Sequence, residues 1–560
     1  MKKLLNWKLA LLLIILLAVF LRFYQLGNIP AGFLNDEANA GYDAYSILLT
    51  GKDQWNNFLP INNFIGFGDF QPPVNRYSQL LPIKIFGSNE FSVRFMSALA
   101  GVLSVAALYF LVKKLINWRA AFFSALLLAI MPWAVGLNRI GHESNLAILF
   151  LIAALFFGLV PKSGKSLLIA VFFLALSMYT YSAYILYAPL VLVVVLGVNY
   201  KKGKGYGYLL KPLILLLIII SPIIFQKNSA SVRFSQVGLT TNVSSVGLIN
   251  NLNDQRGQCL AASNPFICKI TDNKALLFPS VFVKNYLSHF SPNFLYISGT
   301  PTQFSILPQR GLDYLFNFLP LIAGIIFFLK NYKQRKLSGA LFILFLLAPV
   351  PDSFTSDGNY TRSSMMQPFI ALFGGLGIYY CLDFLGRKKW LEYLFTTLIF
   401  LVISFALISF FIIYSTYFKN NYSIYSQYGY KDLVKKISSC KNDYTKIYIS
   451  RHLNDAKQYI YYLFYTKYDP RKYQSKKDVS YSVGADGWVS VDRVENIYFV
   501  QNLPTVSTQS AETNSAVLFI SNPVDFPKSL KPVFVVKDKL GNVIFEAVRS
   551  TDLLEYINRE

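Results

Sequence analysis

Charged residues are scarce in this chain of 560 residues, because Asp, Glu, Lys and Arg together make up 15% of it. Soluble proteins carry about a quarter charged residues. Hydrophobic residues make up 54% of the chain, and the mean hydropathy is +0.40. This balance excludes a wholly soluble enzyme and predicts a polytopic α-helical membrane protein.

Cysteine and histidine are also rare, with four and three copies and no Cys-x-x-Cys pair. Neither a zinc signature nor a disulfide framework is therefore present. Cys259 and Cys268 lie in a long segment predicted to face outward, where a disulfide is permitted, and the sequence leaves the bonded and free states open. A glycine-rich phosphate loop is absent as well, so no nucleotide site is expected.

Long apolar runs are what the chain has in abundance. A membrane span needs about 20 mostly apolar residues, and Arg22, Phe23 and Tyr24 after the first run leave no signal-peptide cleavage site. Eleven spans are predicted, with the N-terminus inside, at about 9–21, 92–112, 119–137, 145–160, 166–178, 184–198, 209–225, 313–329, 338–350, 365–384 and 392–417.

Basic residues support this topology. Lys and Arg exceed Asp and Glu by 24, and they cluster in alternate short connections at 113–119, 162–165, 201–204, 330–336 and 387–389. Cytoplasmic loops carry such an excess. Much of the positive charge is therefore a topology signal, and no nucleic-acid partner is expected.

The other connections face outward in this topology, and two of them are long, at 24–91 and 226–312. After the last span, residues 418–560 form a polar tail with predicted strands at 446–450, 497–500 and 516–520, a helix at 453–466 and a hairpin turn at Gly541-Asn542. Two domains are therefore expected: residues 1–417 in the membrane and a small α/β domain outside, at 418–560.

Two adjacent carboxylates, Asp36 and Glu37, follow the first span by about a dozen residues. Asn35 or Asp36 could cap an interfacial helix that continues through Tyr42 and Tyr45. A carboxylate at the membrane surface can also act as a general base toward a hydroxyl, with its neighbour orienting it. The sequence leaves both interpretations open.

A second cluster lies in the outer turn from Asn138 to Asn145. A cation beside an acid at a helix end is ordinarily an interface anchor. The same spacing would let Arg139 meet a phosphate while Glu143 faces an acceptor or a divalent ion. His142 and Glu143 are the candidate metal ligands, and metal dependence stays open.

Together these residues carry a resemblance. Asp36-Glu37, Gln71-Pro72-Pro73, the stretch from Phe86-Gly87 through Glu90 to Arg94, and Arg139 to Glu143 look like the polyprenyl-phosphate-dependent glycosyltransferases of the protein O-mannosyltransferase and aminoarabinose-transferase type (glycosyltransferase family 39). Their fold is called GT-C. The likeness continues loosely at 289–299 and 351–368.

The resemblance implies a role for each matched residue. Asp36 is the expected base, assisted by Glu37, and Arg94, Arg139 and Arg362 are expected to hold the donor phosphate, with Glu143 binding substrate. Two positions depart from the family pattern, because Gln71 stands where Lys is frequent and Asn359-Tyr360 where a His is frequent. The resemblance therefore does not carry phosphate or metal contact over to these two positions.

The expected function is an inverting sugar transfer from a polyprenyl-phosphate donor to a hydroxyl on a protein, lipid or glycan acceptor, as part of cell envelope glycosylation. The expected location is a multi-pass protein of the plasma membrane, with its active site and C-terminal domain extracytoplasmic. Two alternatives remain: a lipid-linked glycan polymerase or ligase, and a polysaccharide or lipid exporter. The acidic pair favours the transferase, and an exporter would need more charge within the spans.

Overall fold

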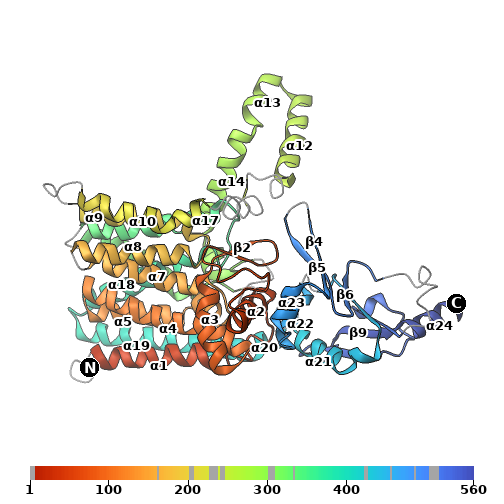
Figure 1. The fold of residues 1–560 in the computed structure, drawn as a ribbon. Coiled ribbons are helices and arrows are strands. Elements are labelled where there is room, and N and C mark those ends of the chain that lie inside the picture. The colour runs from red at the N-terminus through yellow and green to blue at the C-terminus, as the bar shows by residue number, and fades with distance from the viewer. Residues whose placement is uncertain are drawn as a thin grey trace.

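The computed structural model describes residues 7–160, 163–200, 207–225, 238–239, 246–300, 310–331, 335–421, 427–453, 457–484, 487–503 and 516–559. Within these ranges a bundle of apolar helices lies on one side of the molecule and a mixed sheet on the other (Figure 1). The N-terminus is at the far end of the bundle from the sheet.

Each of the eleven apolar segments predicted from the sequence contains a helix. The bundle helices are α1 (Trp7–Phe23), α4 (Glu90–Leu115), α5 (Trp118–Ile130), α6 (Pro132–Asn138), α7 (Ser144–Leu159), α8 (Gly164–Met178), α9 (Tyr184–Asn199), α10 (Gly207–Phe225), α15 (Phe318–Asn331), α16 (Arg335–Leu347), α18 (Gln367–Leu385) and α19 (Lys389–Ile413).

By length and composition, four helical stretches among the described residues are long and apolar enough to cross a membrane: Glu90–Leu115, Arg335–Ser353, Ser364–Leu385 and Lys389–Thr416. The bent pair α5 and α6 makes a fifth if it counts as one span. The remaining bundle helices are apolar but shorter. The structure is therefore that of an integral membrane protein, while the number of eleven spans stays a prediction.

The break between α5 and α6 bends the chain by 56°, and a buried arginine compensates for it. Pro132 has no N–H to donate to Leu128, and the Trp133 N–H bonds to the Leu312 carbonyl instead of Ala129. Arg22, which is fully buried, donates to the freed carbonyls of Leu128 at 3.2 Å and Ala129 at 2.9 Å. Backbone polar groups inside a membrane need such partners.

Between the bundle and the sheet lies the segment predicted as the first outer loop. It forms α2 (Asn35–Thr50), the short strands β1 (Phe64–Ile65) and β2 (Phe70–Gln71), and α3 (Val74–Phe86). The helix predicted through Tyr42 and Tyr45 is α2, which packs against α22 (Gln458–Tyr465). A Cβ at Gly41 would lie 2.7 Å from the Phe464 ring, so the contact needs glycine there.

The predicted C-terminal strands are confirmed. β3 (Lys446–Ser450) runs parallel to both β6 (Ile497–Val500) and β7 (Val517–Ser521) at the centre of a sheet that has seven strands in the described residues. The flanking strands are antiparallel, in the order β4-β5-β6-β3-β7-β9-β8. Their bounds are β4 (Val479–Val483), β5 (Val489–Val494), β8 (Phe534–Lys537) and β9 (Val543–Arg549).

The turn predicted at Gly541-Asn542 joins β8 to β9. Asp538 stabilises the turn by accepting hydrogen bonds from the Asn542 N–H and from the Asn542 side chain. The helices beside the sheet are α21 (Tyr430–Cys440), α22, α23 (Pro470–Ser475) and α24 (Ser550–Arg559). The predicted helix at 453–466 is observed as α22, and residues 454–456 lie outside the described part of the chain. A domain boundary at 417 stays a prediction.

The second long connection contains a helical arm, which we define as α12 (Val246–Ala262), α13 (Pro265–Thr271) and α14 (Lys274–Ser288). The arm projects sideways from the bundle near α17 (Val350–Ser353) (Figure 1). Cys259 and Cys268 form a disulfide that joins α12 to α13. Of the two states left open by the sequence, the bonded one is observed.

Candidate functional site

The first turn of α2 positions the acidic pair. Asp36 is exposed, whereas Glu37 is 2% exposed. Glu37 Oε2 accepts from the Leu34 N–H at 3.0 Å, which caps the helix, and Glu37 Oε1 accepts from the Gly141 N–H at 2.8 Å. Glu37 therefore ties α2 to the turn after α6, and Asp36 is turned outward on the same helix end.

Arg94 completes the surroundings of Glu37. Its Nε lies 2.8 Å from Glu37 Oε1, and its Nη2 lies 3.1 Å from Oε2. Three further donations go to the carbonyls of Leu26, Pro30 and Gly32. The side chain is fully buried, and these contacts occupy its guanidinium. Arg94 thus holds the segment before Asp36 in place, and since its N–H groups are bonded to protein acceptors, we do not expect it to contact a donor phosphate.

Arg139 has a similar structural environment. Its guanidinium donates to the carbonyls of Leu21, Tyr24 and Ile29 and to the hydroxyl of Tyr414, at 2.5–3.0 Å. Leu21 lies in the last turn of α1, where carbonyls lack helical partners. Arg139 is 2% exposed and caps α1 instead of facing a cavity, so we do not expect it to contact a donor phosphate.

Asp36 lines a polar chamber of about 820 Å³ that lies between the bundle and the sheet. Glu143 and Arg362 line the same chamber from the bundle side. His452, Lys457 and Trp488 line it from the sheet side. The structure therefore brings Asp36, Glu37, His142, Glu143 and Arg362 to one cavity, although they are up to 326 positions apart in sequence.

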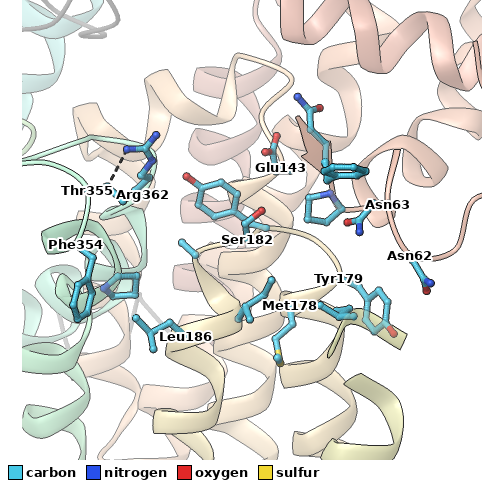
Figure 2. A pocket seen from close by; sticks show the side chains of 18 residues that line it. Asn62, Asn63, Glu143, Met178, Tyr179, Ser182, Leu186, Phe354, Thr355 and Arg362 are labelled. Carbon is cyan, nitrogen blue, oxygen red and sulfur yellow. Dashed lines mark hydrogen bonds between the residues drawn. The ribbon is translucent and has the colours of Figure 1, made fainter. Parts of the chain in front are cut away.

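An apolar cavity of about 460 Å³ adjoins the chamber. Met178, Ile185, Leu186, Ile223 and Phe354 line it, and they come from α8, α9, α10 and the end of α17. In Figure 2, Glu143 and Arg362 lie at one end, while Met178, Leu186 and Phe354 lie at the other. The cavity thus runs from apolar helix surfaces to charged side chains.

Four residues line both cavities: Gln71, Glu143, Tyr181 and Arg362. Burial raises the pKa of the Tyr181 hydroxyl, so Tyr181 is a neutral hydrogen-bond donor at this junction. Since these four side chains belong to both walls, a molecule with an apolar tail and a polar head could occupy the two cavities together, with its head at the junction.

Gln71 is held at the junction by charged neighbours. Its Oε1 accepts from Arg76 Nη2 at 2.5 Å, and its Nε2 donates to Asp69 Oδ2 at 3.0 Å. Arg76 also pairs with Asp43 at 2.8 Å, and both side chains are at most 2% exposed. Burial raises the pKa of Asp43 to about 6, although Arg76 opposes the shift. An amide suits this position, because one end faces a cation and the other an anion.

The backbone of Arg362 is held by a loop that Asp352 organises. Asp352 is fully buried, and its carboxylate accepts from Thr355 Oγ1, Ser356 Oγ and the Asn359 N–H. Asn359 in turn accepts from the Arg362 N–H at 3.2 Å. Thr355 bonds to the Arg362 guanidinium at 3.0 Å, the dashed line in Figure 2. Asn359 therefore has a structural role in this loop.

His289 connects this loop to the arm. Its ring is fully buried, with Nδ1 2.6 Å from the Asn285 carbonyl and Nε2 2.9 Å from Asp352 Oδ2. A carbonyl only accepts, so Nδ1 donates to Asn285, and a second hydrogen bond joins Nε2 to the Asp352 carboxyl group. The sequence showed His289 only as part of a loose likeness, and nothing in its spacing pointed to Asp352, 63 positions away.

A metal could use few of these groups. His142 Nδ1 accepts from the Ser144 N–H at 3.1 Å and lies 4.0 Å from Glu143 Oε2. Among the described residues, no three His, Cys, Asp or Glu side chains are grouped as a ligand set. His142 and Glu143 alone do not form such a set.

Part of the chain matches a known protein family. Residues 70–225 match the model of the family described as dolichyl-phosphate-mannose-protein mannosyltransferase. The matched segment includes Gln71, Arg94, Arg139 and Glu143, and it begins after Asp36.

Two Bacillus subtilis proteins are similar over part of the chain. "Putative mannosyltransferase YkcB" is 29% identical over 38% of this chain and 26% of its own length. "Putative mannosyltransferase YycA" is 32% identical over 37% of this chain and 30% of its own length. The matches thus span less than a third of either relative.

The fold extends over nearly the whole chain. The crystal structure of ArnT from Cupriavidus metallidurans bound to undecaprenyl phosphate superposes with a TM-score of 0.53 at 12% identity, over 96% of this chain and 97% of that one. Its apo structure gives a TM-score of 0.51. The matched segment therefore lies within a chain that has the GT-C membrane fold, as the sequence predicts.

Proposed function

We propose that the protein is a membrane glycosyltransferase that moves a sugar from a polyprenyl-phosphate donor to a hydroxyl acceptor. The observation that supports this most is the pair of adjoining cavities with Arg362 at their junction. The apolar cavity suits a prenyl chain, and the polar chamber has room for a sugar and an acceptor group. The family that residues 70–225 match and the undecaprenyl phosphate bound to ArnT agree with this substrate class.

The donor phosphate is held by Arg362, with Tyr181 donating a hydrogen bond beside it. Among the described residues, the Arg362 guanidinium bonds to one neutral group, Thr355 Oγ1, and forms no ion pair, in contrast to the occupied guanidinium of Arg94. A guanidinium matches two phosphate oxygens at once. Low polarity on the lipid side strengthens the attraction.

Asp36 is the general base. The acceptor oxygen attacks the anomeric carbon, the bond from that carbon to the phosphate oxygen breaks, and the polyprenyl phosphate leaves with the electron pair. Asp36 takes the proton of the acceptor hydroxyl. Attack opposite to the leaving group inverts the configuration. Glu37 does not touch substrate in this scheme, and it positions Asp36 through Leu34 and Gly141.

The sheet side of the molecule is extracytoplasmic in this proposal, in the plasma membrane. The disulfide between Cys259 and Cys268 supports this side, because disulfides persist in oxidising compartments. Basic residues at the opposite bundle end, such as Lys113, Lys114 and Arg119, agree with a cytoplasmic location there. A protein, lipid or glycan acceptor would approach through the chamber from outside.

Asp36→Asn tests the base. Native membranes that contain the expressed protein are supplied with undecaprenyl-phosphate mannose labelled in the sugar, and label transfer is measured. Loss of general base catalysis should lower the rate about 10²- to 10⁴-fold. Asp357→Asn is the matched control, since Asp357 is an exposed carboxylate of the Arg362 loop that lines neither cavity. Wild-type turnover in Asp36→Asn at equal expression would refute the assignment.

Arg362→Gln tests the phosphate site separately. Binding of undecaprenyl phosphate is measured by native mass spectrometry, which needs no acceptor. We expect weaker binding for Arg362→Gln and unchanged binding for Asp36→Asn. Equal binding by Arg362→Gln and the wild type would remove Arg362 from the donor site.

A further inference from the structure

The helical arm exposes an apolar surface that the sugar-transfer proposal does not use. On α14, the side chains of Leu276, Val283 and Leu287 are 52%, 52% and 60% exposed. At the tip, Phe266 on α13 is 69% exposed. Soluble surfaces rarely carry contiguous apolar patches of this kind, which usually mark an interaction site.

The α14 stripe faces away from the protein body. Leu276, Val283 and Leu287 follow one another at spacings of seven and four residues, so they share one helix face. A neighbouring face holds the arm to the body, because Phe282 packs on Phe354 at a ring distance of 4.7 Å and Tyr286 donates to the Leu346 carbonyl at 2.9 Å. The exposed stripe is therefore separate from the residues of α14 that contact the bundle.

The two long helices of the arm differ in polarity. α14 reads Lys-Ala-Leu-Leu-Phe-Pro-Ser-Val-Phe-Val, whereas α12 carries a run of amides and charges from 250 to 258. In Figure 1 the arm runs across the direction of the bundle helices, with α14 on the side of the bundle and α12 on the side of the sheet. Since the bundle helices cross the membrane, the arm runs along the membrane surface at their sheet-side ends.

We propose that the arm lies in the lipid–water interface at the sheet-side membrane surface, with the stripe of α14 and the tip of α13 against the acyl chains and α12 in water. A helix with an apolar face and basic residues at its margins binds in this way. Lys269, Lys274 and Lys284 are exposed on α13 and α14, which fits anionic headgroups. The disulfide keeps the polar helix joined to the apolar tip.

Spin labels on the full chain in lipid nanodiscs test this orientation. The free cysteines Cys381 and Cys440 are replaced by serine, and the disulfide is kept. A nitroxide is placed by Val283→Cys on the stripe, and the matched control is Asn253→Cys on the exposed side of α12. The nanodiscs contain phosphatidylcholine and phosphatidylglycerol.

We expect oxygen, which partitions into lipid, to relax the label at 283 several-fold more than a water-soluble nickel chelate does. The label at 253 should show the reverse order. Equal nickel accessibility at 283 and 253 would overturn the proposal, because the stripe would then face water. A label at 283 shielded from both reagents would also overturn it, in favour of a protein partner such as a second copy of the chain. Neither result depends on sugar transfer.

Discussion

Replacing Arg94 by leucine should loosen the segment that carries Asp36 much more than it loosens the bundle. The substitution leaves the Glu37 carboxylate buried without its cation and frees the carbonyls of Leu26, Pro30 and Gly32. Removing one partner of a buried ion pair costs about 3–5 kcal/mol. Since about 1.4 kcal/mol is a factor of ten, local opening should become roughly a hundredfold to a few thousandfold more frequent.

Hydrogen exchange measured by mass spectrometry reads this opening locally. Amides of residues 26–50 should lose protection by that factor, while amides of α18 should keep theirs. Arg119→Leu, an exposed arginine at the other end of the bundle, is the control and should change neither. A second change, Glu37→Gln, removes the unpaired charge from the Arg94→Leu protein and should restore part of the protection. Wild-type exchange at 26–50 in Arg94→Leu would refute the role assigned to this pair.

Two further predictions concern groups beside the site. His289→Leu removes one hydrogen bond from the Asn285 carbonyl and one from the buried Asp352 carboxylate, which keep their bonds from Ser288 Oγ and the Asn359 N–H. A hydrogen bond to a charged group contributes about 1.5–3 kcal/mol, so the Arg362 loop should shift and undecaprenyl phosphate binding should weaken about tenfold or more in native mass spectrometry. Unchanged binding would mean that the loop is held without His289. Burial raises the pKa of Asp43 to about 6 in the folded state, so the protonated form of Asp43 favours folding. This contribution to the free energy of unfolding is present below about pH 4 and is lost as the pH rises through 6. Asp43→Asn should flatten the pH dependence of the thermal midpoint between these values, and a midpoint curve parallel to that of the wild type would contradict this.

The helices and the central strands were predictable because their signals are local. Twenty apolar residues or a short β-branched run specify an element without reference to the rest of the chain. The break at Pro132 was missed because the run from 119 to 137 is apolar throughout. What repairs the break is Arg22, more than a hundred positions away, and hydropathy contains no information about such a pairing.

The site was predictable in part, for a related reason. Asp36, Glu143 and Arg362 could be selected as polar residues on one side of the predicted membrane, and the structure brings them to one chamber. Sequence alone did not distinguish a guanidinium that is bonded to carbonyls and to a carboxylate or hydroxyl, as in Arg94 and Arg139, from one that lines a cavity, as in Arg362. That difference depends on which backbone groups lie within hydrogen-bonding distance of each guanidinium, and so on whether the side chain is buried.

The packing of α2 on α22 has a consequence for how the protein is made. One apolar core joins Phe33, Ala38 and Tyr42 to residues such as Tyr461, Phe464 and Phe545 from the other end of the chain. Synthesis runs from the N-terminus, so the first of these residues are translated some 400 positions before their partners. The segment around Asp36 therefore lacks these core contacts at the membrane surface until almost the entire chain has been translated.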